Sequence, residues 1–474
     1  MSLKEAICET PIAMNDPSRN GQVALRSLEG LHGTVPVPPA EAGFWRQLRA
    51  FAGPAFLVSV GYMDPGNWGT DLKAGAEFRY GLLWVVALAS VMAIIMQVIS
   101  ARLGLVAGKD LAQACRDFYP RWSRWPNWLF CELAIVACDL AEVLGSAVAL
   151  NLLFHIPLLW AVIITAFDVL LLLALQGMGM RFLEAIIVVL VATIGTCYFI
   201  EIFVLPQTTP DFLELGGALL TPGFRETGMI VLAIGIIGAT VMPHNLYLHS
   251  ALVQTRKPQG DEHRIRRAIR FNTIDTVLAL SVAFLINAAI LVLAAQEFYG
   301  KKGVVVSLAN GADEADPDWI RVAYLTLTPL LDATAASILF GIALLASGQS
   351  STITGTLAGQ VVMEGFMHWR IRPWARRLIT RSLAIIPAIL IIGLRGNGSI
   401  NDLLVLSQVV LAMQLPFAMF PLLHFTCSRK WMGRYANGWF LTMAGWVSCL
   451  LITALAVYGL PEAMEEAWRV IAGP

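Results

Sequence analysis

The stretch GYMDPGNWGT, residues 61–70, interrupts an apolar run at the point where a membrane-spanning helix would be half complete. The thirteen residues before the interruption, FAGPAFLVSVGYM at 51–63, cover only about 20 Å as a helix. Asp64 and Pro65 then follow directly. Because proline lacks the amide hydrogen that an α-helix needs, we expect the helix to break near the middle of the bilayer.

A second stretch, residues 229–245, repeats this design further along the chain. The apolar residues MIVLAIGIIGATV, 229–241, are followed by MPHN at 242–245, which shares an x-Pro-x-Asn pattern with DPGN at 64–67. The motifs fall on the first and sixth expected spans, so the chain enters the membrane from opposite sides. Paired interruptions of this kind indicate an inverted-repeat transporter with a central binding site, whereas one motif alone is equally typical of a proline kink.

The composition places most of the chain in a membrane. Of 474 residues, 57% are hydrophobic and 14% are charged, against roughly 45–50% and about 25% in ordinary soluble domains. The formal net charge of zero argues against a nucleic-acid partner. We expect an all-α polytopic membrane protein with eleven spans. Their expected ranges are 51–71, 81–101, 127–152, 158–176, 182–204, 228–252, 272–296, 330–350, 378–394, 402–426 and 438–460.

Basic residues predict how the chain is oriented. With a cytoplasmic N-terminus, 25 of the 33 lysines and arginines fall on the inner side, five of them in the segment 367–381, as the positive-inside rule requires. We therefore expect a monomeric, multi-pass protein of the cell's inner membrane with an extracytoplasmic C-terminus. The expected parts are a loosely ordered tail (1–45), a transporter domain (46–460) of two repeats (46–204 and 228–426) and an extra helix (438–460), and an outer tail (461–474).

The two breaks offer a mixed set of metal ligands. Asp64 supplies a carboxylate, which is costly at that depth unless it meets a cation or a proton, and Asn67 supplies an amide oxygen. Met242 supplies a thioether, and the opened turn before it frees the carbonyl of Ala239. Sulfur beside oxygen favours Mn²⁺ or Fe²⁺ over Mg²⁺ and Ca²⁺. Gln408 on the tenth span could add an amide oxygen, or could serve as an interhelical hydrogen bonder.

A second polar set is expected to carry protons. Glu132, Asp139 and Glu142 fall within an arc of about 80° on the third span. A row of membrane carboxylates suggests a proton relay, although Glu132 lies near enough to the cytoplasmic end to reach water instead. His244 follows Met242 by two residues and can exchange protons near neutral pH, and His249 lies five residues further on.

Other features narrow the function without adding a site. HNLYLH, 244–249, lacks the spacing and the glutamate of a zinc hydrolase, so an enzyme is not expected. No phosphate-binding loop is present, so transport driven directly by ATP hydrolysis is not expected either. The seven cysteines lack any CxxC pair and are interpreted as small core residues, with a soft-metal role for Cys131 and Cys138 as the alternative. The small and hydroxyl residues of 348–360, at the end of the eighth expected span, suit close helix packing or a gate.

The motifs DPGN (64–67), MPHN (242–245) and GQSSTITGTLAGQVVMEG (348–365) together resemble the natural resistance-associated macrophage protein (Nramp) family, bacterial branch. The likeness extends from about residue 45 to 460. It implies a LeuT-type fold of two inverted five-helix repeats plus an eleventh helix, and Mn²⁺ or Fe²⁺ import coupled to protons. The metal is then cargo, and no cofactor is expected. Magnesium-type relatives lack the methionine, so Met242 argues against that branch.

The resemblance also implies roles for individual residues. The implied metal ligands are Asp64, Asn67, the Ala239 carbonyl, Met242 and Gln408. The implied proton pathway comprises His244, Glu132, Asp139 and Glu142, with Arg381 as an ionic partner. The main rival function is a sodium-coupled symporter of an amino acid on the same fold, whose substrate carboxylate Asp64 would repel. Trp68 and Lys73 are bulkier and more basic than the family pattern, which bears on access from outside.

Overall fold

The computed structural model describes residues 27–28, 33–39, 42–168, 180–200, 210–224, 226, 228–256, 262–300, 319–324, 336–395 and 400–472. The regular elements in this part are all helices. The α-helices are α1 (Phe44–Phe51), α2 (Pro54–Ser59), α3 (Pro65–Phe78), α4 (Leu83–Ala107), α5 (Leu111–Phe118), α6 (Arg124–Phe154), α7 (Leu158–Thr165), α9 (Met180–Phe199), α10 (Phe212–Leu220), α11 (Gly228–Val241), α12 (Pro243–Leu252), α13 (Glu262–Glu297), α16 (Ala336–Met367), α17 (Pro373–Arg395), α18 (Ile400–Cys427), α19 (Arg429–Met432) and α20 (Trp439–Ala472). Short 3₁₀ turns are η2 (Gly61–Met63), η3 (Arg121–Ser123), η5 (Val253–Thr255) and η7 (Gly433–Tyr435).

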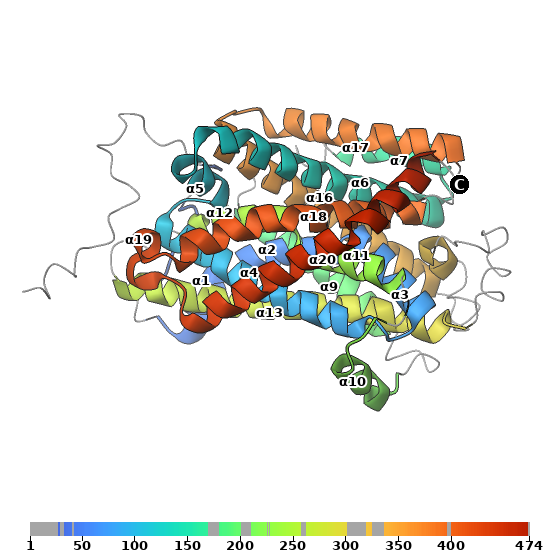
Figure 1. Cartoon of the computed structure of the whole chain (residues 1–474), viewed down its shortest axis with the longest axis horizontal. Helices are drawn as coiled ribbons and strands as arrows, with labels where there is room; N and C mark the ends of the chain where they lie inside the picture. The colour runs from blue at the N-terminus through green and yellow to red at the C-terminus, as the bar shows by residue number, and fades with distance from the viewer. Residues whose placement is uncertain are drawn as a thin grey trace, which may run out of the picture.

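The long helices run side by side along one axis of the molecule (Figure 1). Helices α1, α5 and α19 gather at one end of this bundle, and the C-terminus lies at the other end. Helix α10 projects from the side of the bundle near the C-terminal end (Figure 1). Many large apolar side chains point outward, among them Leu285 and Leu450, which are 63% and 65% exposed. Such a surface suits contact with lipid acyl chains.

Eight of the described helices are long and apolar enough to cross a membrane. Three of the eleven expected spans take another form. The first is divided into α2 and α3, the fourth is described only over α7, and the ninth is α17, which carries several arginines. The eighth also differs from expectation, because α16 continues to Met367. The stretch 348–360 therefore lies inside a helix and not at its end.

The two broken helices run in opposite directions. The first broken helix consists of α2 and α3, and the second consists of α11 and α12. Helices α2 and α12 lie toward the end that holds α1, whereas α3 and α11 lie toward the C-terminal end (Figure 1). The first half of the chain thus begins its broken helix where the second half finishes its own. This is the arrangement expected of two inverted repeats.

A further break, at Gly53, separates α1 from α2 inside the stretch that the sequence predicts as one helix. Gly53 has φ +131°, and a Cβ placed on it would lie 2.3 Å from the carboxyl carbon of Glu184. Asp275 accepts hydrogen bonds from the backbone nitrogens of Gly53 and Ala55, at 3.3 and 3.0 Å. Glu184 in turn pairs with Arg256 at 2.6 Å. Only glycine fits this backbone without strain.

The two chain ends hold more structure than the expected tails. Backbone nitrogens of Gly33 and Val35 donate to the carbonyls of Gln254 and Thr255 in η5, at 3.3 and 3.2 Å. The segment before α1 is thereby attached to the end of α12. At the other end, α20 continues past residue 460 to Ala472.

Helices α4 and α12 approach very closely at Gly104. A Cβ at this position would lie 2.0 Å from the carbonyl oxygen of Ser250 and 2.6 Å from a methyl group of Val253. A backbone carbonyl cannot move aside cheaply, so the glycine sets the distance between the two helices.

We expect Gly104→Ala to lower the melting temperature in detergent, because overpacking of this kind typically costs about 1–3 kcal/mol. Gly216→Ala on α10 is the matched control, since nothing lies within 4 Å of its Cβ position. That change should leave the melting temperature unchanged or raise it slightly, by the helix propensity of alanine. Equal melting temperatures for the two variants would show that the α4–α12 contact is not tightly packed.

Candidate functional site

The first break places Asp64 at the N-cap of α3, with extended backbone angles of φ −67° and ψ 165°. Its Oδ1 accepts hydrogen bonds from the backbone nitrogen and the Nδ2 of Asn67, at 2.9 and 2.7 Å. Its Oδ2 is buried and has no hydrogen-bond partner among the described residues. Pro65 fits the first helical position because an N–H there would have no partner within the helix.

The second break places Met242 at the N-cap of α12, with φ 40° and ψ 101°. A positive φ is strained for a residue with a side chain, and such strain is typical of functional positions. In an unbroken helix, the carbonyl of Ala239 would accept from the nitrogen of residue 243. Pro243 has no hydrogen to donate, so this carbonyl is available to another partner.

Side chains of neighbouring helices pair the backbone groups exposed at the first break. The carbonyl of Tyr62 accepts from Nδ2 of Asn287 on α13 at 2.8 Å, and the carbonyl of Met63 accepts from Oγ of Ser347 on α16 at 2.5 Å. The Tyr62 hydroxyl donates to the carbonyl of Val241 at 3.4 Å, which joins the two breaks. The unwound segments are therefore held by α13 and α16.

Asn67 bridges the two breaks through its amide group. Its Nδ2 donates to Oδ1 of Asp64 and, at 3.1 Å, to the carbonyl of Ala239. Its Oδ1 faces two donors, Nδ2 of Asn287 at 3.2 Å and Oγ1 of Thr240 at 3.4 Å. The partially positive NH₂ group thus lies between the two oxygens that a cation would contact.

Met242 and Gln408 complete the set. The sulfur of Met242 accepts a hydrogen bond from Nδ2 of Asn245 at 3.3 Å. Gln408 on α18 packs against the start of α3, where a Cβ on Gly66 would lie 2.0 Å from its Nε2. Its Nε2 donates to Oγ of Ser407 at 2.9 Å, and its buried Oε1 has no partner among the described residues.

The structure brings the five predicted ligand residues to the place where the breaks meet. They are Asp64, Asn67, Ala239, Met242 and Gln408, all of them buried. Within the described ranges, no three His, Cys, Asp or Glu side chains are grouped so as to hold a metal ion. Cys138 shares a small buried cluster with Met242, Ala134 and Leu411 beside this site, and Cys131 is buried elsewhere in the core.

The acidic stripe on α6 is paired with arginines of α17. Glu132 accepts from Arg376 at 2.8 Å. Asp139 accepts from Arg377 at 2.9 Å and from Arg381 at 2.6 Å. The predicted partner Arg381 is therefore in place beside Asp139, and two further arginines join it.

Two more carboxylates complete the inner part of this cluster. Glu142 pairs with Arg377 at 3.2 Å and accepts from Oγ1 of Thr352 at 3.1 Å. Asp168, which follows α7, pairs with Arg381 and lies 3.5 Å from Arg377. Three carboxylates, Asp139, Glu142 and Asp168, thus share two guanidinium groups. When all are ionised the cluster carries one net negative charge, which a bound proton would neutralise.

Glycines of α16 make room for this cluster. A Cβ on Gly355 would lie 3.0 Å from Oε1 of Glu142, and a Cβ on Gly359 would lie 1.6 Å from a nitrogen of Arg376. The stretch 348–360 therefore combines close packing with contact to the ionised groups. The close packing expected of its small residues is confirmed, and a gate in this stretch stays a prediction.

The arginines of α17 correct one expectation. The charge count places the five arginines of residues 367–381 on the inner side, with the ninth span beginning at 378, but α17 begins at Pro373. Arg376, Arg377 and Arg381 are consequently buried in the bundle. A signal for this was present, because residues 377 and 381 are four apart and share one helix face.

The two histidines lie on α12, apart from the acidic cluster. His244 is 2% exposed, and its Nδ1 has no partner within the described structure. His249 is fully buried, with Nδ1 2.9 Å from Oε1 of Gln97 on α4. Nε2 of Gln97 donates to the Tyr62 hydroxyl at 2.6 Å. His249 is thereby linked to the breaks through Gln97, and among the described residues its side chain makes no hydrogen bond or ion pair with α6.

Several residues near the site are not apparent from the sequence motifs. Asn287 and Ser347 pair the exposed backbone, as described above. Asp71, two turns beyond Asp64 on α3, is 1% exposed, and neither of its carboxylate oxygens has a hydrogen-bond partner among the described residues. Its spacing of seven residues from Asp64, which places both carboxylates on one face of α3, could have identified it. Lys73 lies 3.7 Å from Asp402 at the start of α18, and Trp68 packs against Tyr198 and Phe340.

Fold and site together define a membrane transporter with two inverted repeats and a buried central site. The family model described as "Natural resistance-associated macrophage protein-like" matches residues 55–462. The chain belongs to the Nramp family.

Relatives and solved structures agree with this assignment. The chain is 49% identical over 445 residues to a protein of Nostoc sp. named "Divalent metal cation transporter MntH", with 92% of this chain and 96% of the relative covered. A protein of the same name from Ralstonia nicotianae is 48% identical over 447 residues, covering 94% and 96%. A crystal structure of the Eremococcus coleocola manganese transporter matches with a TM-score of 0.82 at 37% identity, covering 93% and 91%.

A more distant match shows the fold alone. The nucleobase-cation-symport-1 family transporter Mhp1 aligns with a TM-score of 0.55 at 13% identity, covering 91% of this chain and 95% of the other. The expected fold class is confirmed: an all-α polytopic membrane protein of the LeuT type, with its first and sixth helices broken.

Removing Arg381 should destabilise the protein strongly, because Asp139 and Asp168 would lose a buried partner. Loss of one member of such a pair typically costs about 3–5 kcal/mol. We expect Arg381→Gln to lower the melting temperature clearly, and the double variant Arg381→Gln/Asp168→Asn to recover part of the loss.

The exposed pair Arg79–Glu214, 2.8 Å apart, provides the control. Arg79→Gln should change stability by at most about 1 kcal/mol, as surface pairs do. If Arg381→Gln melted at the same temperature as Arg79→Gln, the buried cluster would make no net contribution to stability.

Proposed function

We propose that this chain imports the divalent transition metals Mn²⁺, Fe²⁺ and Cd²⁺ by alternating access, coupled to protons. Its family membership, and close relatives named as divalent metal cation transporters, make it a divalent metal cation transporter and not an enzyme. The observation that carries the choice of metal is the donor set at the breaks: one carboxylate, two amides, a freed main-chain carbonyl and a thioether.

This donor set suits a dipositive ion of intermediate softness. Asp64 supplies negative charge, and the carbonyl of Ala239 and the amides of Asn67 and Gln408 supply neutral oxygens. Met242 supplies sulfur, which Mn²⁺, Fe²⁺ and Cd²⁺ accept more readily than Mg²⁺ or Ca²⁺. An organic substrate with its own carboxylate would meet Asp64 and be repelled, which disfavours an amino-acid symporter.

Transport requires the site to open to each side in turn. In this structure the ligand side chains are buried, so access from either side needs movement of the broken halves. We assign the end with α1, α5 and α19 to the cytoplasm, because basic residues concentrate there. In this orientation, α2 and α12 would open inward and α3 and α11 outward. The protein would act as a monomer in the inner membrane.

The acidic cluster is suited to carry the coupled proton. Its one excess negative charge favours a proton, and Glu142 lies near the metal site through Cys138. The thiol of Cys138 is 3.7 Å from Oε1 of Glu142, and Cys138 belongs to the same buried apolar cluster as Met242, with Ala134 and Leu411. A positive charge arriving at Asp64 would therefore change the proton affinity of this cluster, and a proton on the cluster would change the metal affinity by the same factor, so the two sites are coupled.

The ligand assignment is tested by uptake into proteoliposomes at fixed pH and membrane potential. Asp64→Ala should abolish Mn²⁺ uptake, because the remaining ligands are neutral and cannot offset desolvation of a dipositive ion. Met242→Ala should lower Cd²⁺ uptake steeply and Mn²⁺ uptake in part, while Ca²⁺ or Mg²⁺ uptake rises relative to both. An unchanged Mn²⁺-to-Ca²⁺ ratio in folded Met242→Ala protein would mean that the sulfur only packs.

Proton coupling is tested separately with a pH-sensitive dye inside the vesicles. Asp139→Asn should reduce proton flux more than it reduces Mn²⁺ binding, because the amide keeps the shape of the carboxyl but cannot carry a proton. Glu214→Gln, at the exposed pair, should alter neither quantity. Wild-type proton flux in the Asp139→Asn protein would remove the acidic cluster from the pathway.

A further inference from the structure

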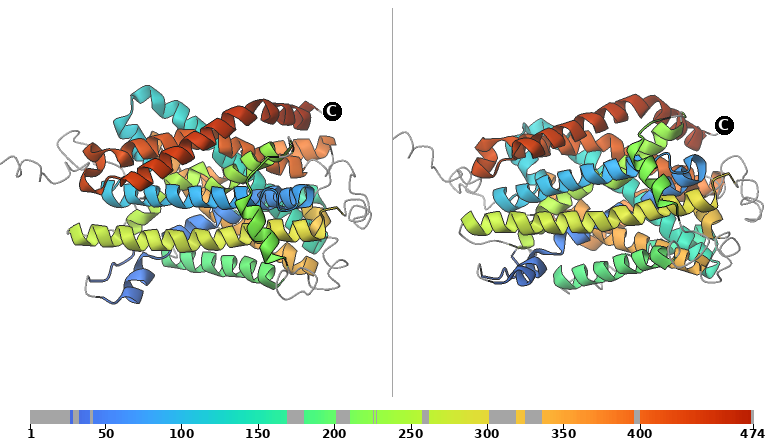
Figure 2. Two further views of the ribbon diagram at one scale, coloured as in Figure 1. Left: turned by 60° about the horizontal axis from the view of Figure 1, so that its bottom comes forward. Right: turned by 90° about the horizontal axis from the view of Figure 1, so that it is seen from below.

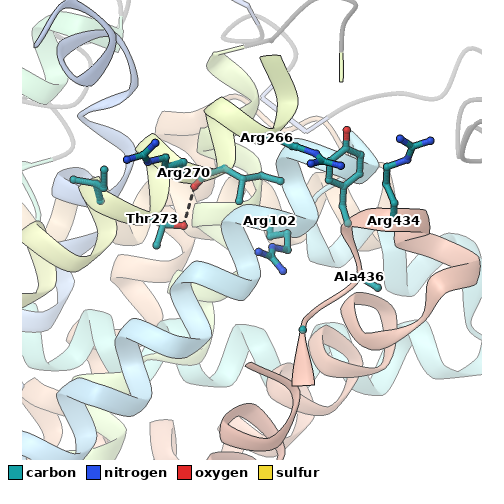
Figure 3. A pocket seen from close by; sticks show the side chains of 10 residues that line it. Arg102, Arg266, Arg270, Thr273, Arg434 and Ala436 are labelled. Carbon is teal, nitrogen blue, oxygen red and sulfur yellow. Dashed lines mark hydrogen bonds between the residues drawn. The ribbon is translucent and has the colours of Figure 1, made fainter. Parts of the chain in front are cut away.

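A basic cavity of about 770 Å³ lies at the proposed cytoplasmic end of the bundle. It is formed by the ends of α4 and α13 and by the segment that leads into α20 (Figure 3). Its lining includes four arginines, Arg102, Arg266, Arg270 and Arg434, together with Tyr435. No metal ligand and no member of the acidic cluster lines it, so it is separate from the transport site.

The positive charge of this cavity exceeds the negative charge that the described residues place beside it. Glu262 is shared by two of the arginines: it pairs with Arg266 at 2.6 Å and also with Arg434. Arg270 forms no hydrogen bond or ion pair with any described residue. Arg102 has one weak contact, at 3.5 Å, to the side-chain oxygen of Asn437. An anion with several acceptor oxygens would satisfy these donors.

A second cavity, of about 410 Å³, continues the first along α13. The two share Arg266 and Arg270, and the second is also lined by Phe44 of α1 and Phe271. Arginines beside aromatic walls suit a ligand that joins an anionic group to an apolar part.

An apolar stripe on α4 lies on the same side of the helix as this cavity. Trp84, Leu88, Val91 and Ile95 are partly or fully exposed, and their spacing of three and four residues puts them on one helix face with Arg102. Helix α4 lies between α13 and α20, seen from two directions in Figure 2. Residues 96–101 are buried, so the exposed stripe ends two turns, about 10 Å, before Arg102, which is within the length of an acyl chain.

We propose that this cavity binds the phosphate headgroup of an anionic phospholipid, with the acyl chains lying along the α4 stripe between α13 and α20. Basic pockets between helices on the cytoplasmic side suit such headgroups, with roughly 1 kcal/mol per arginine. The bound lipid would join three parts of the chain that have few direct ion pairs: the end of α4, the start of α13 and the connection into α20. A free phosphate shares the headgroup chemistry but makes none of the acyl contacts.

Native mass spectrometry of the full-length protein in detergent tests the proposal. Phosphatidylglycerol or phosphatidylcholine is added at equal molar ratio, and retained lipid is counted. Wild type should retain at least one phosphatidylglycerol and little phosphatidylcholine. Arg270→Gln and Arg102→Gln should each weaken retention about fivefold, the factor that corresponds to 1 kcal/mol. Arg372→Gln, an exposed arginine outside both cavities, should retain lipid as wild type does.

A melting-temperature series on the same proteins identifies the source of the phosphate and checks that the variants fold. Phosphatidylglycerol should raise the melting temperature of wild type and Arg372→Gln more than that of Arg270→Gln, while sodium phosphate at matched ionic strength should not. Equal retention of both lipids, unchanged retention in Arg270→Gln, or full stabilisation by free phosphate would each overturn the proposal. These readouts need no metal, so they stand apart from the transport assays.

Discussion

A backbone group set free inside a membrane must find a partner within the protein, because no water is available to it. Pro65 and Pro243 mark the two breaks where such groups arise, and side chains of the surrounding helices pair them. Asn287 of α13 and Ser347 of α16 pair the carbonyls of Tyr62 and Met63. The Ala239 carbonyl remains for Asn67 and, by our proposal, for the metal. By the same proposal, the interruptions that would weaken an ordinary helix also define where the substrate binds.

The second constraint is charge at depth. Burying three ionised carboxylates in an apolar bundle would cost too much free energy without a positive partner. Arg377 and Arg381 supply that partner for Asp139, Glu142 and Asp168. Glu142 and the neighbouring Arg376 fit because α16 presents Gly355 and Gly359 to them, where a larger residue would collide. The ionised cluster therefore depends on the space that the glycine-rich stretch of α16 leaves open. Because the carboxylates outnumber the arginines by one, the cluster is balanced only when it holds an additional positive charge.

Much of this arrangement is predictable from sequence. A proline within an apolar run indicates either a kink or a broken helix, and two matching interruptions favour broken helices that form a site. The breaks, the helical class and the acidic face of α6 follow from local pattern. Other features depend on contacts between distant segments. The sequence predicts that Gly53 lies within a continuous helix. The break there becomes apparent only from the contacts with Glu184 and Asp275, which are distant in the chain. Arg376 and Arg377 look like loop residues, since a basic segment next to a membrane span is usually cytoplasmic. Their burial depends on carboxylates more than 200 residues away in the chain.

The bridging amide of Asn67 bears on how a carrier completes its cycle. A transporter must return to its starting orientation unloaded, and a bare carboxylate at the centre of the membrane would oppose that step. In this structure the NH₂ group of Asn67 faces Asp64 and Ala239, and Asn287 with Thr240 holds the amide in that orientation. An amide held in this way would partly offset the charge of the carboxylate during the return step. By our proposal, a metal that binds through the amide oxygen requires the side chain to turn over, at the expense of four hydrogen bonds. The apparent affinity for cargo would then depend on how easily one side chain rotates.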